Sequence, residues 1–157
     1  MFKPDIKTII EKHFQNVYRL AFSRTQSISD AEDATQEVFL KLIKSKNKFE
    51  NEEHIKAWLI RVTLTTTIDI IKKKNKAQVL PLSDEICFET PEHSDIYQAV
   101  SELPLKYRTV IHLYYYEDLP ITKIAEYLMM KEATVKTHLA RGRKLLRKKL
   151  AKEDEYV

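Results

Sequence analysis

A single glycine, Gly142, occurs in this chain of 157 residues. Such scarcity favours helices, because tight turns and other special backbone conformations depend most often on glycine. It also excludes the glycine-rich loops that bind phosphates and nucleotides, since these need several glycines close together. We therefore expect an all-α fold without a nucleotide cofactor.

Charge is distributed unevenly along the chain, whose formal net charge is +4. Residues 1–76 carry 15 basic and 10 acidic side chains, residues 77–102 carry 0 and 6, and residues 103–157 carry 12 and 7. Two basic segments are thus joined by an acidic one. Because the acidic stretch has prolines and little periodicity, 77–93 is predicted to be a flexible linker between two small helical domains, 1–76 and 94–157.

Other features of the composition exclude several classes of protein. The sequence has no apolar run near the length of a membrane span and no signal-peptide pattern, so we expect a cytoplasmic protein that does not insert into a membrane. The one cysteine, Cys87, can form neither an internal disulfide nor a metal site by itself. Five scattered histidines, with no nucleophile, metal set or carboxylate pair, argue against an enzyme.

Apolar residues at helical spacing predict three helices in the first domain. The first spans Asp5 to about Arg24 and is expected to bury Ile6, Ile10, Phe14 with Val17, and Ala21. The second begins near Asp30, behind a capping box formed by Ser29 and Glu32. Its predicted buried residues are Ala31, Ala34, Val38 and Leu42, beside Thr35 and Phe39.

The third helix contains an unusual run of threonines. Ile55, Trp58, Leu59 and Val62 share one face, and the helix continues to Lys76 through Thr63, Thr65, Thr66 and Thr67. Threonine is a poor helix former because branching at Cβ restricts its rotamers. These four residues therefore need either a packing partner or a surface use for their hydroxyls.

The last third of the chain has the pattern of a helix-turn-helix unit with a basic second helix. Pro104 and Pro120 stand where two helices begin, a position that proline tolerates. From Val135 the apolar positions continue at Leu139, Gly142 and Leu146, on one helical face. The other faces carry Lys136, Thr137, Ala140, Arg141, Lys144 and Lys148. A helix of this kind suits the width of a DNA major groove, although a solvated basic helix has the same pattern.

Three motifs occur in order along the chain: DAEDATQEVFLKLIK (Asp30 to Lys44), AWLIRVTLTTTIDIIKKK (Ala57 to Lys74), and YRTVIHLYYYEDLPITKIAEYL with ATVKTHLARGRKLLRKKL (between Tyr107 and Leu150). Together they resemble the bacterial RNA polymerase sigma factors of the extracytoplasmic-function (ECF) type, in the sigma-70 family. The resemblance implies a sigma region 2-like domain at 1–76, which binds core RNA polymerase and opens the minus-10 promoter element. It also implies a region 4-like helix-turn-helix at 94–157, of the winged-helix-like DNA-binding class, which reads the minus-35 element.

The resemblance assigns minus-35 duplex contacts to the basic helix. Lys136, Thr137 and Arg141 match the family's reading positions, with His138 beside them, and Lys144, Arg147 and Lys148 are expected to follow the backbone. Arginine and lysine can bind guanine edges or phosphates, and both alternatives stay open here. A solvated surface role is the plainer alternative for His138.

Single-stranded minus-10 contacts are assigned to the first domain. The resemblance places Phe49 beside a pocket for an extruded base, and the alternative is a loop residue that packs on the core. The resemblance also assigns contacts with the non-template strand or its phosphates to six residues. They are Arg61, Thr65, Thr66, Lys72, Lys73 and Lys74. Relatives commonly have alanine and asparagine where this chain has Thr63 and Thr65, so its minus-10 preference could differ.

The remaining implied contacts are with proteins. The outward face of the second helix resembles the polymerase-binding surface and comprises Asp33, Gln36, Glu37, Leu40 and Lys41. The linker acids, which would suit the cationic channels of a polymerase as well as an ordinary solvated linker, are Asp84, Glu85, Glu89, Glu92 and Asp95. An anti-sigma factor is a further possible partner, as commonly occurs in the family.

One competing hypothesis is a LuxR-like transcription regulator without a polymerase role. The segment TVKTHL, from Thr134 to Leu139, also resembles the reading helix of that family. Those regulators usually carry an α/β receiver or ligand-sensing domain, which the nearly glycine-free N-terminal half does not match. The sequence therefore favours the sigma factor, whose partners would be core polymerase and promoter DNA.

Overall fold

The computed structural model describes residues 2–46, 48–76 and 95–154, with side chains described as far as Lys152. It contains two compact units, Met1–Ala77 and Gln78–Val157. All regular elements in the described ranges are helical, which confirms the predicted all-α fold class. The predicted linker 77–93, with Cys87 and four of the five linker acids, lies outside these ranges.

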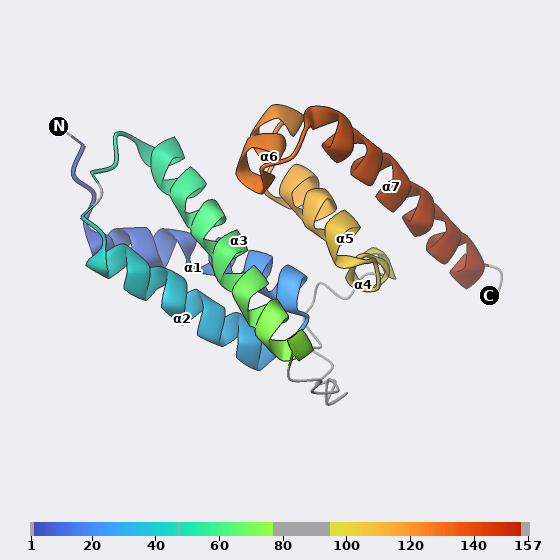
Figure 1. Ribbon diagram of the computed structural model, residues 1–157, viewed down its shortest axis with the longest axis horizontal. Helices are drawn as coiled ribbons and strands as arrows, with labels where there is room; N and C mark the ends of the chain where they lie inside the picture. The colour runs from blue at the N-terminus through green and yellow to red at the C-terminus, as the bar shows by residue number, and fades with distance from the viewer. Residues whose placement is uncertain (1, 47, 77–94, 155–157) are drawn as a thin grey trace. The chain divides into compact units, whose positions relative to one another are not determined.

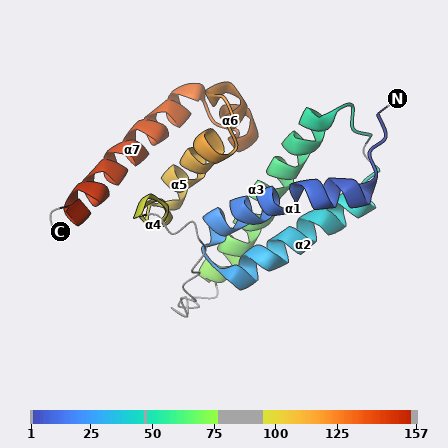
Figure 2. The same ribbon diagram turned by 180° about the vertical axis from the view of Figure 1, so that it is seen from behind.

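The N-terminal unit is formed by α1 (Ile6–Thr25), α2 (Ile28–Lys44) and α3 (Glu52–Lys76). Each helix packs on the other two, and Figures 1 and 2 show α1 and α2 side by side with α3 crossing them. One core cluster comprises Ile9, Val17, Val38, Phe39, Leu42, Ile55 and Leu59. A second cluster comprises the fully buried Ala21, Ala31 and Ala34, and such small side chains allow α1 and α2 to approach closely.

The buried face of α1 matches the predicted stripe only in part, since Val17 and Ala21 are buried as predicted. Ile6 and Phe14 are 41% and 46% exposed. The residues that face the core are Ile9, His13, Val17, Leu20, Ala21 and Arg24. A polar side chain can occupy this face because α3 supplies a partner: Nε of Arg24 donates to Oγ1 of Thr67 at 3.0 Å. A pattern that counts only apolar residues misses such positions.

The start of α2 also lies earlier than predicted. Ser27, rather than Ser29, is the N-cap, and its Oγ accepts a hydrogen bond from the backbone N–H of Asp30 at 3.3 Å. Both serines have an acidic residue three positions later, so the sequence offers two overlapping capping patterns. The stripe predicted for α2 is confirmed, since all six of its residues are buried.

The threonines of α3 mostly have packing roles. Thr63, Thr66 and Thr67 are buried, whereas Thr65 is exposed. The Thr63 hydroxyl donates to the Leu59 carbonyl at 2.6 Å, and the Thr67 hydroxyl donates to the Thr63 carbonyl at 2.7 Å. These bonds satisfy hydroxyl groups that would otherwise be costly to bury.

The C-terminal unit contains α4 (Asp95–Ser101), α5 (Leu105–Ile111), a π-helical turn η1 (His112–Tyr116), α6 (Ile121–Leu128) and α7 (Glu132–Asp154). Helix α7 packs against α4, α5 and α6 (Figure 1). Pro104 and Pro120 precede α5 and α6 directly, as predicted. The buried guanidinium of Arg108 donates to the Leu103 carbonyl at 2.6 Å and thereby ties α5 to the turn after α4.

Gly142 lies where α7 packs against α5. A Cβ atom at this position would lie 2.7 Å from Ile111 Cδ1 and 3.3 Å from Tyr107 Cβ, so a larger residue would require the Ile111 and Tyr107 side chains to shift. Glycine inside a helix costs stability of about 1 kcal/mol relative to alanine, and here the close approach explains its presence.

We predict that Gly142→Val loosens the C-terminal unit by about 1–3 kcal/mol, because the added methyl groups overpack the contact with Ile111 and Tyr107. Hydrogen exchange of α5 and α7 should accelerate. Ala140→Val, on the exposed face of the same helix, provides the control for the helix propensity of valine. Equal exchange in the two variants would contradict the proposed crowding at Gly142.

His13 makes the stability of the N-terminal unit depend on pH. Its side chain is buried on α1, with Nε2 3.5 Å from a carboxylate oxygen of Glu52, which also pairs with Lys12 at 3.3 Å. Burial lowers the pKa of His13 below its usual value, and the Glu52 carboxylate offsets part of this effect. Below about pH 6.5, the unfolded chain therefore takes up a proton that the folded unit resists.

We predict that the free energy of unfolding of this unit falls as the pH decreases from 7.5 to 5.5. Trp58 is the one tryptophan and packs on the first core cluster, so its fluorescence reports urea unfolding of this unit. His13→Gln should have a smaller pH dependence than the wild type, whatever its absolute stability. An unchanged slope would show that His13 is not the responsible group.

Candidate nucleic-acid interface

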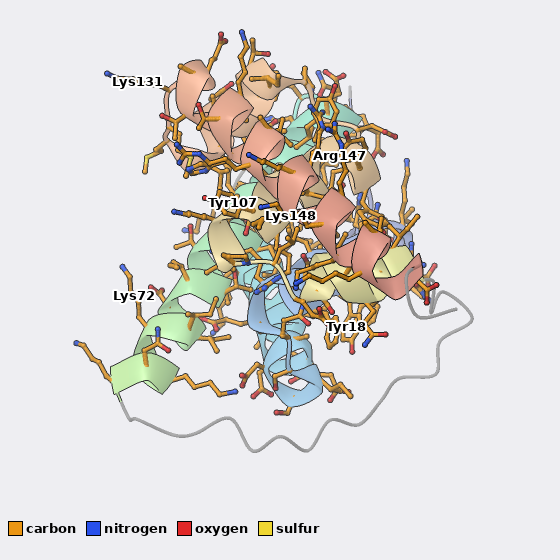
Figure 3. All side chains as sticks on the ribbon, turned by 90° about the vertical axis from the view of Figure 1, so that its right-hand side faces the viewer. Tyr18, Lys72, Tyr107, Lys131, Arg147 and Lys148 are labelled. Atoms are coloured by element: carbon orange, nitrogen blue, oxygen red, sulfur yellow. The ribbon has the colours of Figure 1, made fainter. Side chains whose placement is uncertain are left out.

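Helix α7 separates a buried stripe from a basic face, as predicted. Val135, Leu139 and Gly142 are buried, and Leu146 is half-buried. The exposed positions are Lys136, Thr137, Ala140, Arg141, Lys144, Arg147 and Lys148. Figure 3 labels Arg147 and Lys148 on this helix, together with Lys131, which directly precedes it. The packing of α7 therefore leaves all the predicted cations on its surface, where they can contact DNA.

A short turn connects α6 to α7. Met129 ends α6 in the left-handed conformation, with φ 54°, and the backbone N–H of Met130 donates to the Ala125 carbonyl at 2.9 Å. This arrangement closes a helix end, and glycine usually occupies the left-handed position. The turn occurs here without glycine, and α7 begins at Glu132.

His138 was predicted to be either a DNA-reading residue or a solvated surface residue, and its position in the structure matches neither. It is half-buried, and its ring meets the edge of the Tyr107 ring from α5 at 5.6 Å between centroids. Among the described residues its Nδ1 atom has no hydrogen-bond partner. Burial lowers the pKa of His138, and the positive charges of Lys106 and Arg141 lower it further. The sequence pattern missed this contact because the two residues are far apart in the chain.

Apart from Phe49, the predicted minus-10 residues divide into three groups. Arg61, Thr65, Lys72 and Lys73 are exposed. Lys74 is half-buried, and its Nζ atom lies 3.1 Å from Asp30, so it links α3 to the start of α2. Thr66 is only 1% exposed, and its hydroxyl accepts a hydrogen bond from Lys41 Nζ at 3.1 Å. In this conformation Thr66 therefore presents no surface to a DNA strand, because its side chain supports the packing of α2 on α3.

Phe49 packs on the N-terminal unit from the loop before α3. Its ring contacts His54 and Trp58 edge-to-face, at 5.3 and 5.9 Å between centroids. Phe49 is half-buried against the first core cluster, and Trp58 is likewise half-buried. The structure thus shows the packing that was the alternative interpretation of Phe49, while part of its side chain remains accessible.

The predicted polymerase-binding face of α2 is largely exposed. Asp33, Gln36, Glu37 and Leu40 point to solvent, whereas Lys41 is half-buried. Ile43 was not predicted, although it is 52% exposed, as is Leu40 three residues before it. Ile43 therefore extends the exposed face that contains the predicted Leu40, and it adds a second aliphatic side chain one turn further along α2.

The remaining expectations from the sequence concern metal ligands, membrane spans and the linker acids. No group of three or more potential metal ligands occurs among the described residues, and none of the helices in those ranges has the length and apolar character of a membrane span. Asp95, the one linker acid that is described, is exposed in the first turn of α4.

Comparisons with known proteins identify the family. Residues 9–77 match the model of sigma-70 region 2, and residues 93–146 match that of sigma-70 region 4. The RNA polymerase sigma factor SigV of Bacillus subtilis (strain 168) is 38% identical over 153 residues, which cover 94% of this chain and 92% of the relative. The ECF RNA polymerase sigma factor SigW of the same organism is 30% identical over 162 residues, with coverages of 90% and 87%.

A solved structure has the same fold. The sigma factor RpoE from Bartonella quintana, in complex with the anti-sigma factor NepR, matches with a TM-score of 0.78 and 20% sequence identity. The match covers 92% of this chain and 96% of that protein. The two region matches and the similarity to SigV and SigW show the family. The chain belongs to the RNA polymerase sigma factors of the extracytoplasmic-function type.

Proposed function

We propose that this chain binds core RNA polymerase and directs it to a promoter, with residues 1–76 at the minus-10 element and residues 94–157 at the minus-35 element. The observation that carries the proposal is the basic face of α7, whose cations are exposed opposite a buried apolar stripe. Such a helix can enter a major groove with its packing intact. The polymerase performs the nucleotidyl transfer, so this protein needs no catalytic residues and acts in the cytoplasm, where the polymerase works.

Within the minus-35 surface, we assign the central role to Arg141. It is exposed on α7 between Thr137 and Lys144, on the face opposite the buried stripe. Its guanidinium can form two parallel hydrogen bonds with a guanine edge or bind a phosphate. His138 is not assigned a base contact, because its ring packs against Tyr107.

The N-terminal unit offers a second, distinct surface. Arg61, Thr65, Lys72 and Lys73 are exposed on α3 and are proposed to hold the opened non-template strand. The accessible part of Phe49 offers an aromatic surface on which an unstacked base could pack. The exposed face of α2, including Leu40, is the proposed contact with core polymerase.

The experiment that tests this function is a run-off transcription assay with bacterial core polymerase and a library of promoter-like templates. We expect discrete transcripts that require both this protein and core. Arg141→Ala should reduce them by about five-fold or more, because a good contact to a base or phosphate is worth about 1–3 kcal/mol. The control is Lys123→Ala on α6, where Nζ lies 3.7 Å from the Glu126 carboxylate and the charge is already partly compensated.

Duplex binding without polymerase-dependent transcripts would instead favour a regulator of the LuxR type. Transcripts that are insensitive to Arg141→Ala would leave the sigma function in place and refute the assignment of Arg141. The selected upstream sequences would define the minus-35 and minus-10 elements.

We further propose that an anti-sigma factor holds this protein inactive. Support comes from two solved structures of the same fold, RpoE in complex with NepR and CnrH in complex with the cytosolic domain of CnrY. We expect the tagged protein to retain, in its native host, a partner that inhibits the transcription assay when purified and added back. Recovery of no inhibitory partner would refute this proposal.

A further inference from the structure

A cation of α5 lies beside the basic face of α7. Lys106 is exposed, and its Nζ atom lies 5.1 Å from the centroid of the Tyr107 ring (Figure 3 labels Tyr107). The Tyr107 ring in turn meets the His138 ring of α7. Lys106 therefore belongs to the surface formed where α5 and α7 meet.

Arg141, on the exposed face of α7, lies beside the same surface. It follows His138 by three residues, about one helical turn, so the two side chains are neighbours along the helix. Both Lys106 and Arg141 lie close enough for their charges to affect His138. The edge of the basic face is thus formed by cations from two different helices.

These cations lack acidic partners. Within residues 95–152 of the C-terminal unit, neither Lys106 nor Arg141 forms an ion pair, whereas Lys123 lies near Glu126 and Lys149 near Glu102. An exposed cation without a nearby counter-charge is available to bind an anion such as a phosphate. The pattern fits a polyanionic ligand better than a purely structural role.

We propose that Lys106 binds a backbone phosphate of the minus-35 duplex, at the edge of the groove that α7 enters. This inference rests on the proposed function of α7. A helix in the major groove has a phosphate backbone on each side, and cations beside the helix are placed to contact it. The minus-35 interface then extends from α7 onto α5, and Lys106 fixes the position of α7 along the groove without reading sequence.

The test measures binding of the complete holoenzyme, formed with core polymerase, to a fluorescent promoter duplex over a range of KCl concentrations. Lys106→Ala should weaken binding several-fold, to a similar extent for different minus-35 sequences. It should also reduce the slope of log K against log[KCl] by about 0.9, the value for one lost phosphate contact. Lys106→Arg should retain the slope, and Lys123→Ala provides the matched control on α6.

The contacted phosphate can be located with duplexes that carry one neutral methylphosphonate at successive positions. At one position, the neutral group should weaken binding of the wild type but not of Lys106→Ala, because the variant has already lost that contact. Additive losses at every position, or an unchanged salt slope in Lys106→Ala, would overturn the proposal.

The two proposals fail in distinguishable ways. If Arg141→Ala weakens binding while Lys106→Ala does not, only the role of Lys106 is refuted. If neither variant affects a holoenzyme that still binds the promoter, the proposed role of α7 is refuted as well. Circular dichroism of Lys106→Ala should match the wild type, because the substituted side chain is exposed.

Discussion

The close approach of α7 to α5 at Gly142 determines what the C-terminal unit can present to DNA. A Cβ at this position would lie 2.7 Å from Ile111 Cδ1 and 3.3 Å from Tyr107 Cβ, so glycine lets the apolar stripe of α7 pack on α5 without displacing these side chains. Val135 and Leu139 are then fully covered. The buried stripe, the bond from Arg143 to Tyr115 and the ion pair of Lys149 with Glu102 anchor the helix, so the exposed cations on the opposite face remain available for a ligand.

In the N-terminal unit, α3 packs on two helices and also carries the surface that is proposed to contact DNA. Two adjacent threonines have these two roles. Thr66 is buried and accepts a hydrogen bond from Lys41 of α2, whereas Thr65 is exposed. Arg24 of α1 is bonded to Thr67 in the same way. Polar bonds between helices therefore fix the orientation of α3, and with it the direction in which Arg61 and Thr65 point.

The proposed functional surfaces in both units combine residues from more than one segment of the chain. In the C-terminal unit, Tyr107 connects Lys106 of α5 with His138 of α7 through two ring contacts. In the N-terminal unit, Phe49 from a loop rests on Trp58 of α3. Each surface thus depends on packing between segments, so a change in the core can alter binding without removing a contact residue.

The sequence by itself determined the helical class, the family and the faces of α2 and α7, because these depend on local periodicity and on motifs within one helix. It was right only in part for the stripe of α1, where Val17 and Ala21 are buried as predicted but polar His13 and Arg24 also occupy core positions. It did not predict that Thr66 and His138 are wholly or partly buried. It also did not single out the exposed side chains of Lys106 and Ile43. Only the tertiary structure decided which of these side chains are buried and which are exposed. The burial of a polar side chain depends on a partner from another helix, and the exposure of a side chain depends on which residues pack beside it.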